Sequence, residues 1–498
     1  MRLLFRVDCS VSIGAGHLMR TLCLANLAAR YGITSHFLCK DLPGFDTTLI
    51  TQQHHEMTLL PSDITWRQFY RLLLTLGQFD WLIVDHYQLD QRWERAVGAL
   101  LPQQLIIDDL ANRDHWATQL LDMSLIRQAR DYHSSHWLRE PLLGPSFALL
   151  RPEFASLRPQ AVIKRRATDM VNHLLISLGA MDADNHLTRL INALDSLPLA
   201  PLTIDIALSR HAPHLMALKK AIASSRHAIT LHLDSDQMAQ LMLNADLAIG
   251  AGGISCWERA TLALPTLLFI LADNQRGNSQ QLSHINAASY LGDLRELDDK
   301  TLAKQLIRHW PTATTLRLMA NNCAKLCDGD GAIKVLSHLT RQDLPTQLAA
   351  ITQDDAQWMW QWQQDESTRY YSRHHSAPTL SEHQTWLTAA LNEPHRWLFK
   401  LISNNQPCAV IRLDEASLER PVNEVSLYVN PRRYHQGHGK QALTLLRQLF
   451  PTIRLHAYIH PDNIASLTLF QQFGFQPMAD DNWFYHPPLE INDDALYY

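Results

Sequence analysis

The sequence predicts an α/β protein of three units: two lobes, each built around a parallel sheet with helices on both faces, and a smaller α/β domain after them. The chain has 498 residues, which is too many for one ordinary hydrophobic core. Strand-like apolar runs alternate with helical periodicity over about the first 340 residues, as is typical of parallel sheets. After about residue 355 the pattern changes to a Trp-rich helix followed by closely spaced β-runs. The predicted units are residues 1–155, 156–340 and 356–485, with a linker at 341–355 and an acidic tail at 486–498.

Each unit is supported by its own series of expected elements. In the first lobe these are strands at 3–7, 35–39, 81–85 and 105–108, with a helix over about 16–31 after the first strand. In the second lobe they are strands at 174–177, 202–207, 229–233, 246–250 and 266–269. In the third unit they are strands at 397–402, 409–413, 425–429 and 453–459.

The composition is that of a soluble globular protein, with 46% apolar and 19% charged residues. The net charge of −5 gives no electrostatic argument for binding nucleic acid or an anionic membrane, so neither partner is expected. The seven Cys are scattered, which predicts free thiols. No apolar run approaches the ~20 residues of a membrane span, and the start lacks the apolar stretch of a signal peptide. A cytoplasmic location is therefore expected, whereas the oligomeric state is not indicated.

A glycine-rich loop follows the first expected strand and places His17 at the start of a helix. Gly14 and Gly16 allow the backbone to approach a phosphate, and the N–H groups of a helix start favour negative charge. A neutral imidazole is a suitable general base near pH 7, so His17 is the strongest candidate for chemistry. The alternative is a histidine that packs at the helix start between the two lobes.

The second lobe repeats this pattern at two strand ends, first in a small-residue loop around Gly179 and then in a glycine-rich turn at 250–255. Gly252, Gly253 and Ser255 form a turn that opens a helix, where backbone amides and a hydroxyl suit a diphosphate. Glu258 follows in the first helical turn, where a carboxylate can accept both hydroxyls of a ribose. Alternatively, Glu258 interacts only with the helix dipole.

Together with the segments at 83–87, 108–113 and 144–154, these loops resemble the UDP-sugar hydrolases of pseudaminic acid biosynthesis, which are related to the glycosyltransferase-B group. The resemblance covers about residues 1–340 and implies two Rossmann-like lobes. It also implies cleavage of UDP-2,4-diacetamido-2,4,6-trideoxy-β-L-altropyranose to UDP and the free sugar, by attack of water on the anomeric carbon. By motif position, His17 becomes the general base and Tyr87 faces the sugar.

The same resemblance assigns a set of residues to binding of the UDP-sugar. They are Gly14, Gly16, Arg20, Gly179, Gly252, Gly253, Ser255, Glu258, Asn274 and Gln275. For Arg20, and for Arg6 as a further source of positive charge, pairing with a nearby Asp is an equal alternative. The loop–helix starts would hold the diphosphate without a metal, and Asp108 and Asp109 are expected to cap turns rather than bind one. His86 and His115 receive no role.

The third unit carries a second glycine loop, which starts at Gln436 and opens a helix, as a cradle for a pyrophosphate would. With the segments at 463–466 and 473–475, it resembles the GNAT superfamily of N-acetyltransferases over about residues 350–480. The resemblance implies acetyl-CoA as co-substrate. The residues that it assigns to acetyl-CoA are Val429, Gln436, Gly437, His438, Gly439, Lys440 and Asn463.

Two positions depart from the pattern of that superfamily. Gln441 stands where a small residue is usual, and Phe470 stands where many members carry a Tyr that protonates the leaving thiolate. A phenyl ring cannot donate that proton, so water or another group must do so. A base for the acceptor amine is also needed, and Glu424, His456 and His460 are the candidates, with ordinary strand-edge polarity as the alternative.

The helix at 358–371 resembles that of acetyltransferases acting on the amino sugars of nucleotide-sugars. The residues that suggest an acceptor pocket there are Trp362, Asp365, Arg369, His383 and Trp386. An aromatic stripe at helical spacing is more often core, and this alternative stays open.

The combination predicts a bifunctional nucleotide-sugar enzyme, in which one half acetylates a UDP-4-amino sugar and the other removes UDP from the product. One alternative is a glycosyltransferase-like enzyme with a protein N-acetyltransferase domain. Another is an enzyme for a related, legionaminic-type diamino sugar, since the sequence does not give the stereochemistry. A third is a UDP-sugar sensor without catalytic activity.

Overall fold

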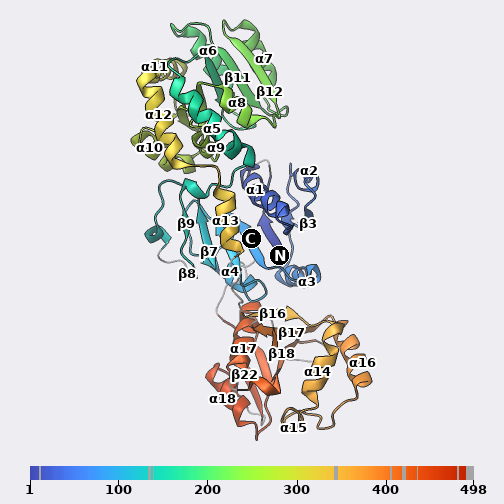
Figure 1. The fold of residues 1–498 in the computed structure, drawn as a ribbon. Coiled ribbons are helices and arrows are strands. Elements are labelled where there is room, and N and C mark those ends of the chain that lie inside the picture. Colours follow the sequence, from blue (N-terminus) through green and yellow to red (C-terminus); the bar gives the residue numbers. More distant parts are fainter. Residues whose placement is uncertain are drawn as a thin grey trace.

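The computed structural model describes residues 1–10, 13–132, 136–137, 139–340, 346–403, 406–417, 422–434, 436–478 and 482–489. Within these ranges the chain forms three units that follow one another along one long axis (Figure 1). The first lobe lies in the middle, between the second lobe and the third unit. Residues 490–498 of the predicted tail and residues 341–345 of the predicted linker lie outside the described residues.

The first lobe is built on a seven-stranded parallel sheet of order β3-β2-β1-β4-β5-β7-β9. Its strands are β1 (Arg2–Val7), β2 (Thr34–Lys40), β3 (Glu56–Leu60), β4 (Trp81–Asp85), β5 (Gln104–Ile107), β7 (Gln119–Asp122) and β9 (Leu142–Leu143). Its helices are α1 (Gly16–Arg30), α2 (Thr48–Thr51), α3 (Trp66–Leu76) and α4 (Gln91–Val97). A separate pair is formed by β6 (Trp116–Ala117) and β8 (His136–Trp137). Because the main sheet is parallel, the carboxyl ends of β1, β4 and β5 meet at one edge, where binding loops usually lie.

The second lobe contains a six-stranded parallel sheet of order β12-β11-β10-β13-β14-β15. Its strands are β10 (His173–Ser177), β11 (Thr203–Leu208), β12 (Ala228–Leu233), β13 (Leu247–Ala251), β14 (Thr266–Ile270) and β15 (Ser289–Asp293). Its helices are α5 (Pro152–Ala167), α6 (His186–Ser196), α7 (Leu215–Ser224), α8 (Met238–Asn244), α9 (Ser255–Thr261), α10 (Arg276–His284), α11 (Asp299–His309) and α12 (Ala313–Leu326). The loops after β10, β13 and β14 therefore share one edge of this sheet.

The chain crosses between the two lobes twice, and the two crossings touch. The first crossing leads into α5, and the second leads from α12 through Gly329 to α13 (Gly331–Leu339), which lies against α1 of the first lobe. Trp81 Nε1 donates a hydrogen bond of 2.8 Å to the carbonyl of Leu339 at the end of α13. Gly329 has a φ of +88°, and a Cβ there would come within 2.9 Å of the Cα of Ala155. The segment at Gly329 and the start of α5 are therefore packed so closely that a side chain at residue 329 would not fit.

The third unit has a seven-stranded mixed sheet of order β16-β17-β18-β19-β20-β22-β21. Its strands are β16 (Gln347–Ala350), β17 (Arg396–Ser403), β18 (Gln406–Asp414), β19 (Glu424–Val429), β20 (Leu455–Tyr458), β21 (Gln476–Pro477) and β22 (Trp483–His486). Its helices are α14 (Ala356–Gln363), α15 (Glu366–Tyr370), α16 (Leu380–Leu391), α17 (His438–Leu449) and α18 (Ile464–Gln472). Strand β16 pairs with β17, so the sheet already begins within the predicted linker at 341–355.

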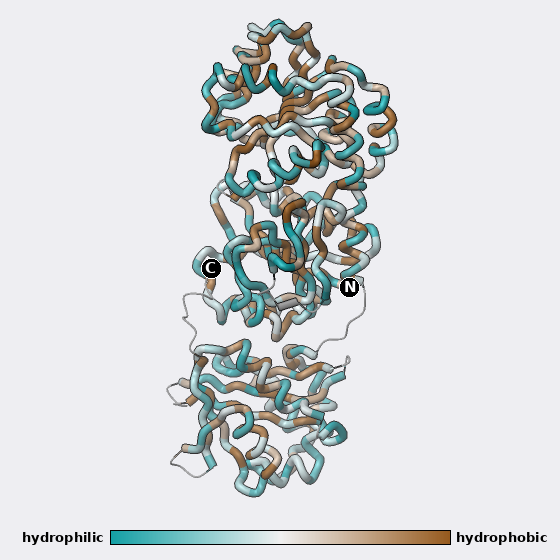
Figure 2. Tube along the Cα trace, turned by 90° about the vertical axis from the view of Figure 1, so that its left-hand side faces the viewer, coloured by the Kyte–Doolittle hydropathy of each residue, from teal (hydrophilic) through white to brown (hydrophobic). Residues whose placement is uncertain are grey.

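The third unit and the first lobe share one continuous hydrophobic core. Tyr70 of α3 lies 6.2 Å from the ring of Phe450, and the guanidinium of Arg71 stacks on Trp397 at 4.1 Å. The backbone N–H of Leu348 donates to the carbonyl of Ala99, which precedes β5. The third unit therefore docks at the amino end of the first sheet, opposite the edge that faces the second lobe (Figure 1). Figure 2 shows hydrophobic segments running through all three units, interspersed with hydrophilic ones.

None of the helices in the described ranges is long and apolar enough to span a bilayer. All seven cysteines are free thiols, in agreement with their scattered spacing.

Candidate active sites

The histidine at the start of α1 is hydrogen-bonded to a carboxylate at the end of β4. His17 Nδ1 lies 2.6 Å from Asp85 Oδ1, and Asp85 is 1% exposed. Arg20, one helical turn after His17, donates from Nε and Nη2 to the two oxygens of the same carboxylate, at 2.5 and 2.6 Å. Burial raises the pKa of Asp85, but Arg20 and His17 outweigh this effect and hold the pKa well below its usual range. Because an ionised carboxylate only accepts hydrogen bonds, Nδ1 carries the proton and the lone pair of His17 Nε2 is left to accept one.

Tyr87 covers one side of this pair. Its ring lies 4.5 Å from the His17 ring in an edge-on arrangement, and its hydroxyl lies 3.4 Å from Asp109 Oδ2. Arg20 Nη1 donates to the same Asp109 oxygen at 3.2 Å. Only 10% of the His17 side chain is exposed, so the ring is far more enclosed than its loop position suggests. Arg20, predicted as a ligand of the UDP-sugar, is buried against two carboxylates, as the pairing alternative states.

The loop that precedes His17 is held by a backbone hydrogen bond between its two ends, and there is open space beside its glycines. Gly14 has a φ of +79°, and its N–H donates to the carbonyl of Ser10 at 2.8 Å. Gly16 is the first residue of α1. Apart from the adjoining residues and the backbone of α1, no atom of the described residues lies within 4 Å of the place where a Cβ would stand on either glycine.

The glycine loop of the second lobe contacts the segment after β14, so two of the predicted motifs are neighbours. A Cβ on Gly252 would clash with the Ser279 hydroxyl and lie 3.0 Å from the Cβ of Gln275. A Cβ on Gly253 would lie 3.9 Å from Gln275 Nε2. Asn274 is exposed beside them, and Gly179, with a φ of +103°, follows the neighbouring strand β10.

A buried arginine lies beneath this loop, and sequence reasoning did not select it. Arg259 is 2% exposed and donates from Nη1 to the Ser255 hydroxyl at 3.0 Å and from Nη2 to the carbonyl of Ala251 at 2.7 Å. Since the Ser255 oxygen accepts from Arg259, its own O–H is free to donate outward. The i, i+4 spacing on α9 is the sequence signal that would have linked the two residues.

Glu258 lies where the two lobes meet. Burial raises the pKa of its carboxyl, although Arg151 opposes this effect. Burial, followed by the charge of Glu258, raises the pKa of the Cys23 thiol in α1 to about 12, so this carboxylate is close to the first lobe. The lobes also touch where the N–H of Leu125 donates to Asn278 Oδ1 at 2.8 Å.

In the third unit, β19 and β20 separate just before the predicted acetyl-CoA loop. Within the described residues they share the single pair Glu424–His456, so Val429 at the end of β19 is not paired with β20 there. Gly437 precedes α17 with a φ of +79°. A Cβ on Gly439 would lie 2.8 Å from Leu469 and 3.7 Å from Val429, so the start of α17 packs closely on α18 and contacts the sheet at β19.

The other predicted acetyl-CoA residues surround this loop or begin the next helix. His438 is buried and lies 3.3 Å from Gln436 Oε1 and 3.2 Å from Gln441 Oε1, which gives the unusual glutamine a local structural role. Lys440 is exposed. Asn463 uses its side-chain oxygen to cap α18 by accepting from the N–H of Ser466 at 3.0 Å. Phe470 is buried 4.9 Å from the ring of Phe475, as a core residue.

The three base candidates have different surroundings. Glu424 forms an ion pair with Arg373 at 2.8 Å. His456 is 7% exposed, its Nδ1 has no hydrogen-bond partner among the described residues, and burial lowers its pKa. His460 lies 5.7 Å from each of the rings of Tyr370 and Tyr371. Glu424 and His456 are paired neighbours on adjacent strands, whereas His460 lies beyond the end of β20.

The residues proposed for an acceptor pocket are largely engaged within the unit. Trp362 packs 4.4 Å from Trp358, and Asp365 caps α15. Arg369 donates to the carbonyl of Gln363 at 2.7 Å. His383 is buried and stacks 5.5 Å from Trp386. These contacts fit the core alternative.

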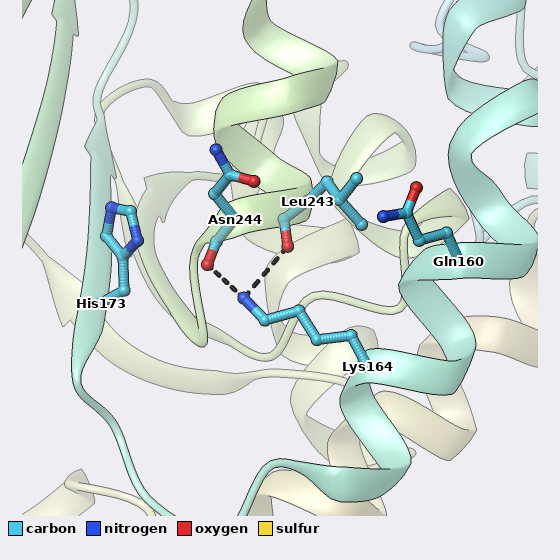
Figure 3. Close-up of a pocket in the computed structure, with 5 residues that line it drawn as sticks. All are labelled: Gln160, Lys164, His173, Leu243 and Asn244. Carbon is cyan, nitrogen blue, oxygen red and sulfur yellow. Dashed lines mark hydrogen bonds between the residues drawn. The ribbon is translucent and has the colours of Figure 1, made fainter.

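A cavity of about 450 Å³ in the second lobe lies apart from both sites (Figure 3). Its lining residues are Gln160, Lys164, His173, Leu243 and Asn244. Lys164 donates to the carbonyls that end α8 and pairs with Asp246 at 3.2 Å. This lysine therefore has a structural role at the amino end of the sheet.

Two family models match separate parts of this chain. Residues 346–476 match the acetyltransferase (GNAT) domain, and residues 218–332 match the glycosyltransferase family 28 C-terminal domain. The chain is 29% identical over 245 residues to the UDP-2,4-diacetamido-2,4,6-trideoxy-β-L-altropyranose hydrolase of Campylobacter jejuni, covering 49% of this chain and 81% of that protein. The predicted resemblance is confirmed.

Two further comparisons support the architecture. The chain is 29% identical over 203 residues to the spore coat polysaccharide biosynthesis protein SpsG of Bacillus subtilis, spanning 40% of this chain and 58% of SpsG. The crystal structure of Acinetobacter baumannii MurG superposes with a TM-score of 0.54 and 16% identity, covering 68% of this chain and 99% of MurG. The predicted fold class, two Rossmann-like lobes of the glycosyltransferase-B type followed by a GNAT domain, is therefore confirmed.

Proposed function

We propose that the chain catalyses two consecutive steps on one UDP-amino sugar. The third unit transfers the acetyl group of acetyl-CoA to the 4-amino group. The two lobes then hydrolyse UDP-2,4-diacetamido-2,4,6-trideoxy-β-L-altropyranose to UDP and the free sugar. The observation that carries the second step is the His17–Asp85 pair, at the edge of the first sheet that faces the second lobe. Among the described residues, no hydrogen bond to His17 Nε2 is found.

In the hydrolytic step, His17 Nε2 accepts a proton from water as the water oxygen attacks the anomeric carbon. Asp85 accepts the hydrogen bond from Nδ1 and stabilises the imidazolium that forms. The bond from the anomeric carbon to the UDP oxygen breaks, and UDP leaves with its electron pair. The glycine loop at 252–255, above the charge of Arg259, stabilises the departing diphosphate, while Glu258 binds the ribose and Asn274 and Gln275 line the sugar.

For the acetyl-transfer step, the separated edges of β19 and β20 and the close-packed Gly439 suit an extended co-substrate. Acetyl-CoA, when bound, supplies the activated acetyl group. Val429 would bind its arm, and residues 436–440 would bind its pyrophosphate. Glu424 or His456 would remove the proton from the acceptor amine.

The first experiment locates the broken bond. The full-length protein is incubated with the diacetamido UDP-sugar in water enriched in heavy oxygen, and both products are analysed by mass spectrometry. We expect the label in the sugar. Label in UDP would mean attack at phosphorus and would contradict the mechanism, and an absolute need for a second acceptor would favour a glycosyltransferase.

The second experiment identifies the acceptor of the acetyl group. The full-length protein is given acetyl-CoA with a panel of UDP-amino sugars, including legionaminic-type isomers, and with peptides. A mass gain of one acetyl group on one UDP-4-amino sugar is expected. Acetylation of peptides alone would support the protein N-acetyltransferase alternative.

The His17→Asn variant separates catalysis from sensing. It removes the base but keeps a polar side chain of similar size, so UDP release should fall by about 1,000-fold while UDP affinity changes by less than about twofold. Unchanged UDP release in this variant would exclude His17 as the base.

A further inference from the structure

The residues around Tyr87 form a short irregular segment after β4. This Tyr87 segment (residues 86–89) belongs to neither a helix nor a strand. Tyr87 is 37% exposed, yet its ring is held edge-on at 4.5 Å from His17. Backbone groups outside regular structure need other partners, so the contacts of this segment decide where Tyr87 lies.

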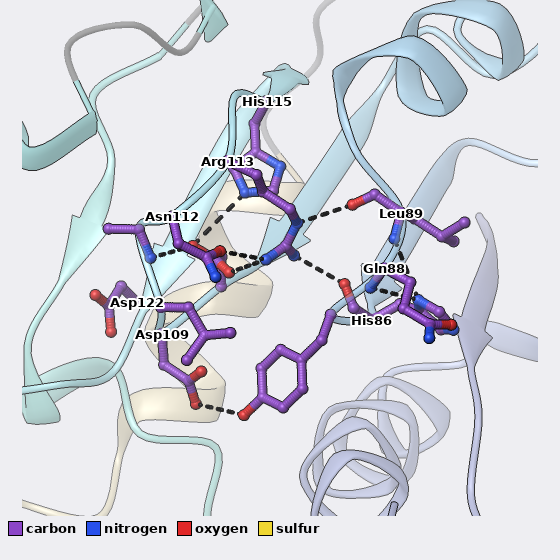
Figure 4. A network of polar contacts seen from close by, with 12 residues as sticks. His86, Gln88, Leu89, Asp109, Asn112, Arg113, His115 and Asp122 are labelled. Carbon is purple, nitrogen blue, oxygen red and sulfur yellow. Dashed lines mark hydrogen bonds and ion pairs between the residues drawn. The ribbon is translucent and has the colours of Figure 1, made fainter. Parts of the chain in front are cut away.

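One arginine binds both ends of the Tyr87 segment. Arg113 donates from Nη2 to the carbonyl of His86 at 2.8 Å and from Nε to the carbonyl of Leu89 at 2.9 Å (Figure 4). Its third arm, Nη1, donates to Asp108 Oδ1 at 2.7 Å. The planar guanidinium therefore joins the loop after β5 to the loop after β4.

The Arg113 side chain is itself fixed by a buried charge network. The other oxygen of Asp108 accepts from the N–H of Ala111 at 2.8 Å and lies 3.6 Å from His115 Nε2. His115 Nδ1 lies 2.7 Å from Glu94 Oε1. Arg113 retains only 12% of its side-chain exposure, so it has little freedom to move away from the segment.

The ring of His86 binds the amide groups of the same segment. Its Nδ1 accepts from the N–H of Gln88 at 3.1 Å and from the N–H of Leu89 at 3.3 Å. Its Nε2 must then carry the proton, which it donates to Asp8 Oδ2 at 3.0 Å. Within the described residues, we find no other hydrogen bond to the backbone of the Tyr87 segment.

We propose that Arg113 and His86 are positioning residues, which hold Tyr87 against His17 through the backbone of residues 86–89. The inference rests on the proposed function for its effect on catalysis but not for its effect on structure. Neither residue reaches His17 itself. Both fix the main chain on either side of Tyr87, and a small displacement of a group beside a reacting centre can lower a rate by orders of magnitude.

The test uses two pairs of variants. In Arg113→Lys the ammonium can still pair with Asp108, but it lacks the planar fork whose Nε and Nη2 reach the two carbonyls in the wild type. His86→Ala removes the acceptor of the two amides, whereas in His86→Asn the short side-chain oxygen can still accept from an N–H two residues ahead. The control is Arg165→Lys, because Arg165 is also an arginine with little exposure that binds backbone carbonyls, but these lie at the end of α8 in the second lobe.

The structural readout is hydrogen exchange of the full-length protein without ligand. We expect the amides of residues 88–89 to exchange at least about tenfold faster in Arg113→Lys and His86→Ala, and to regain protection in His86→Asn. Arg165→Lys should leave them unchanged. Unchanged exchange in both Arg113→Lys and His86→Ala would overturn the proposal.

The kinetic readout is UDP release from the diacetamido UDP-sugar. The kcat of Arg113→Lys and His86→Ala should fall at least about tenfold, with a smaller change in KM and unchanged affinity for UDP alone, and His86→Asn should recover part of the loss. A loss confined to KM would overturn the positioning role. If the wild-type protein releases no UDP from any UDP-sugar, the proposed function fails, and the exchange data still decide the structural part.

Discussion

At the residue scale, the proposed chemistry depends on which nitrogen of His17 carries a proton. Asp85 is buried and accepts hydrogen bonds from both His17 and Arg20. An acceptor-only partner fixes the tautomer of the imidazole, and the guanidinium fixes the carboxylate. The orientation of the base is therefore set by two residues that need not touch the substrate.

The Asp85→Asn variant tests this arrangement. Arg20 requires an acceptor, so the amide oxygen should turn to Arg20 and the amide N–H₂ toward His17 Nδ1. His17 would then carry its proton on Nε2 and lose its function as a base. We expect the kcat for UDP release to fall by about 100- to 10,000-fold while UDP affinity is retained.

The matched control for that variant is Asp246→Asn. Asp246 is also buried and accepts two backbone N–H groups, but it lies at the amino end of the second sheet. This variant should lose stability without losing the rate of UDP release per folded molecule. Equal losses of rate in the two variants would argue against a specific role for Asp85.

The buried network around His115 predicts a pH dependence of stability. Burial alone would lower the pKa of His115, but the nearby carboxylates of Asp108 and Glu94 raise it to about 9, above the ordinary value of 6.5. The folded state thus binds this proton more tightly than the unfolded state does. The resulting stabilisation of the folded state is complete below pH 6.5 and is lost as the pH rises to about 9. The loss is about 3 kcal/mol at most. Urea unfolding at pH 6.5 and pH 9 should show it in the wild type, and His115→Gln should remove most of the difference.

At the element scale, the strands that could be predicted are the buried ones. The runs at 81–85 and 105–108 match β4 and β5 to within one residue, because central strands of a parallel sheet are apolar on both faces. The edge strand β3 and the bulged strand β15 were missed, since each is half exposed and mixes polar with apolar residues. Strand β16 was assigned to a linker because it follows the polar run at 341–346.

The residues of the candidate site likewise divide into those that could be predicted from local sequence and those that could not. The glycine loops and His17 are local patterns that a sequence displays directly. Asp85, Arg113 and Arg259 were not selected, because the partners of Asp85 and Arg113 come from other strands' loops and only the fold shows that they meet. In the third unit, the histidines and aromatic residues did not show from the sequence alone which of them form a site.

Two neighbouring glycines at the start of α9 allow a test of the loop packing. A Cβ at Gly252 collides with Ser279 and Gln275, whereas one at Gly253 makes only an ordinary contact. Gly252→Ala should lower the free energy of unfolding by about 1–3 kcal/mol, and Gly253→Ala by less than about 0.5 kcal/mol. Equilibrium urea unfolding would measure both. Equal stability of the two variants would contradict the described packing.

At the scale of the whole molecule, the two candidate sites lie at opposite ends of the elements that separate them. The third unit contacts the first lobe through the end of α17, while the acetyl-CoA loop is at the start of that 12-residue helix, about 18 Å away. Across the interface, β4 spans five residues, about 16 Å, before it reaches Asp85. An acetylated intermediate would therefore leave one site and reach the other through solvent.

Complementation tests this conclusion. His17→Asn lacks the base for hydrolysis, and Gly439→Val fills the space beside Leu469 and Val429 that the acetyl-CoA loop needs. A mixture of the two variants should form free sugar from the UDP-4-amino sugar as fast as wild-type protein with the same number of active sites, after a lag. A mixture much slower than the wild type would show direct transfer and contradict the separation.

The contact between Gly329 and Ala155 has a mechanical consequence. The lobes are joined by two covalent tethers at one point rather than by a single flexible strand. Two tethers restrict rotation of one lobe about the axis through both lobes, because such a rotation would wind one segment around the other. The surface of the first lobe that carries His17 and the surface of the second lobe that carries the glycine turn therefore stay opposite one another.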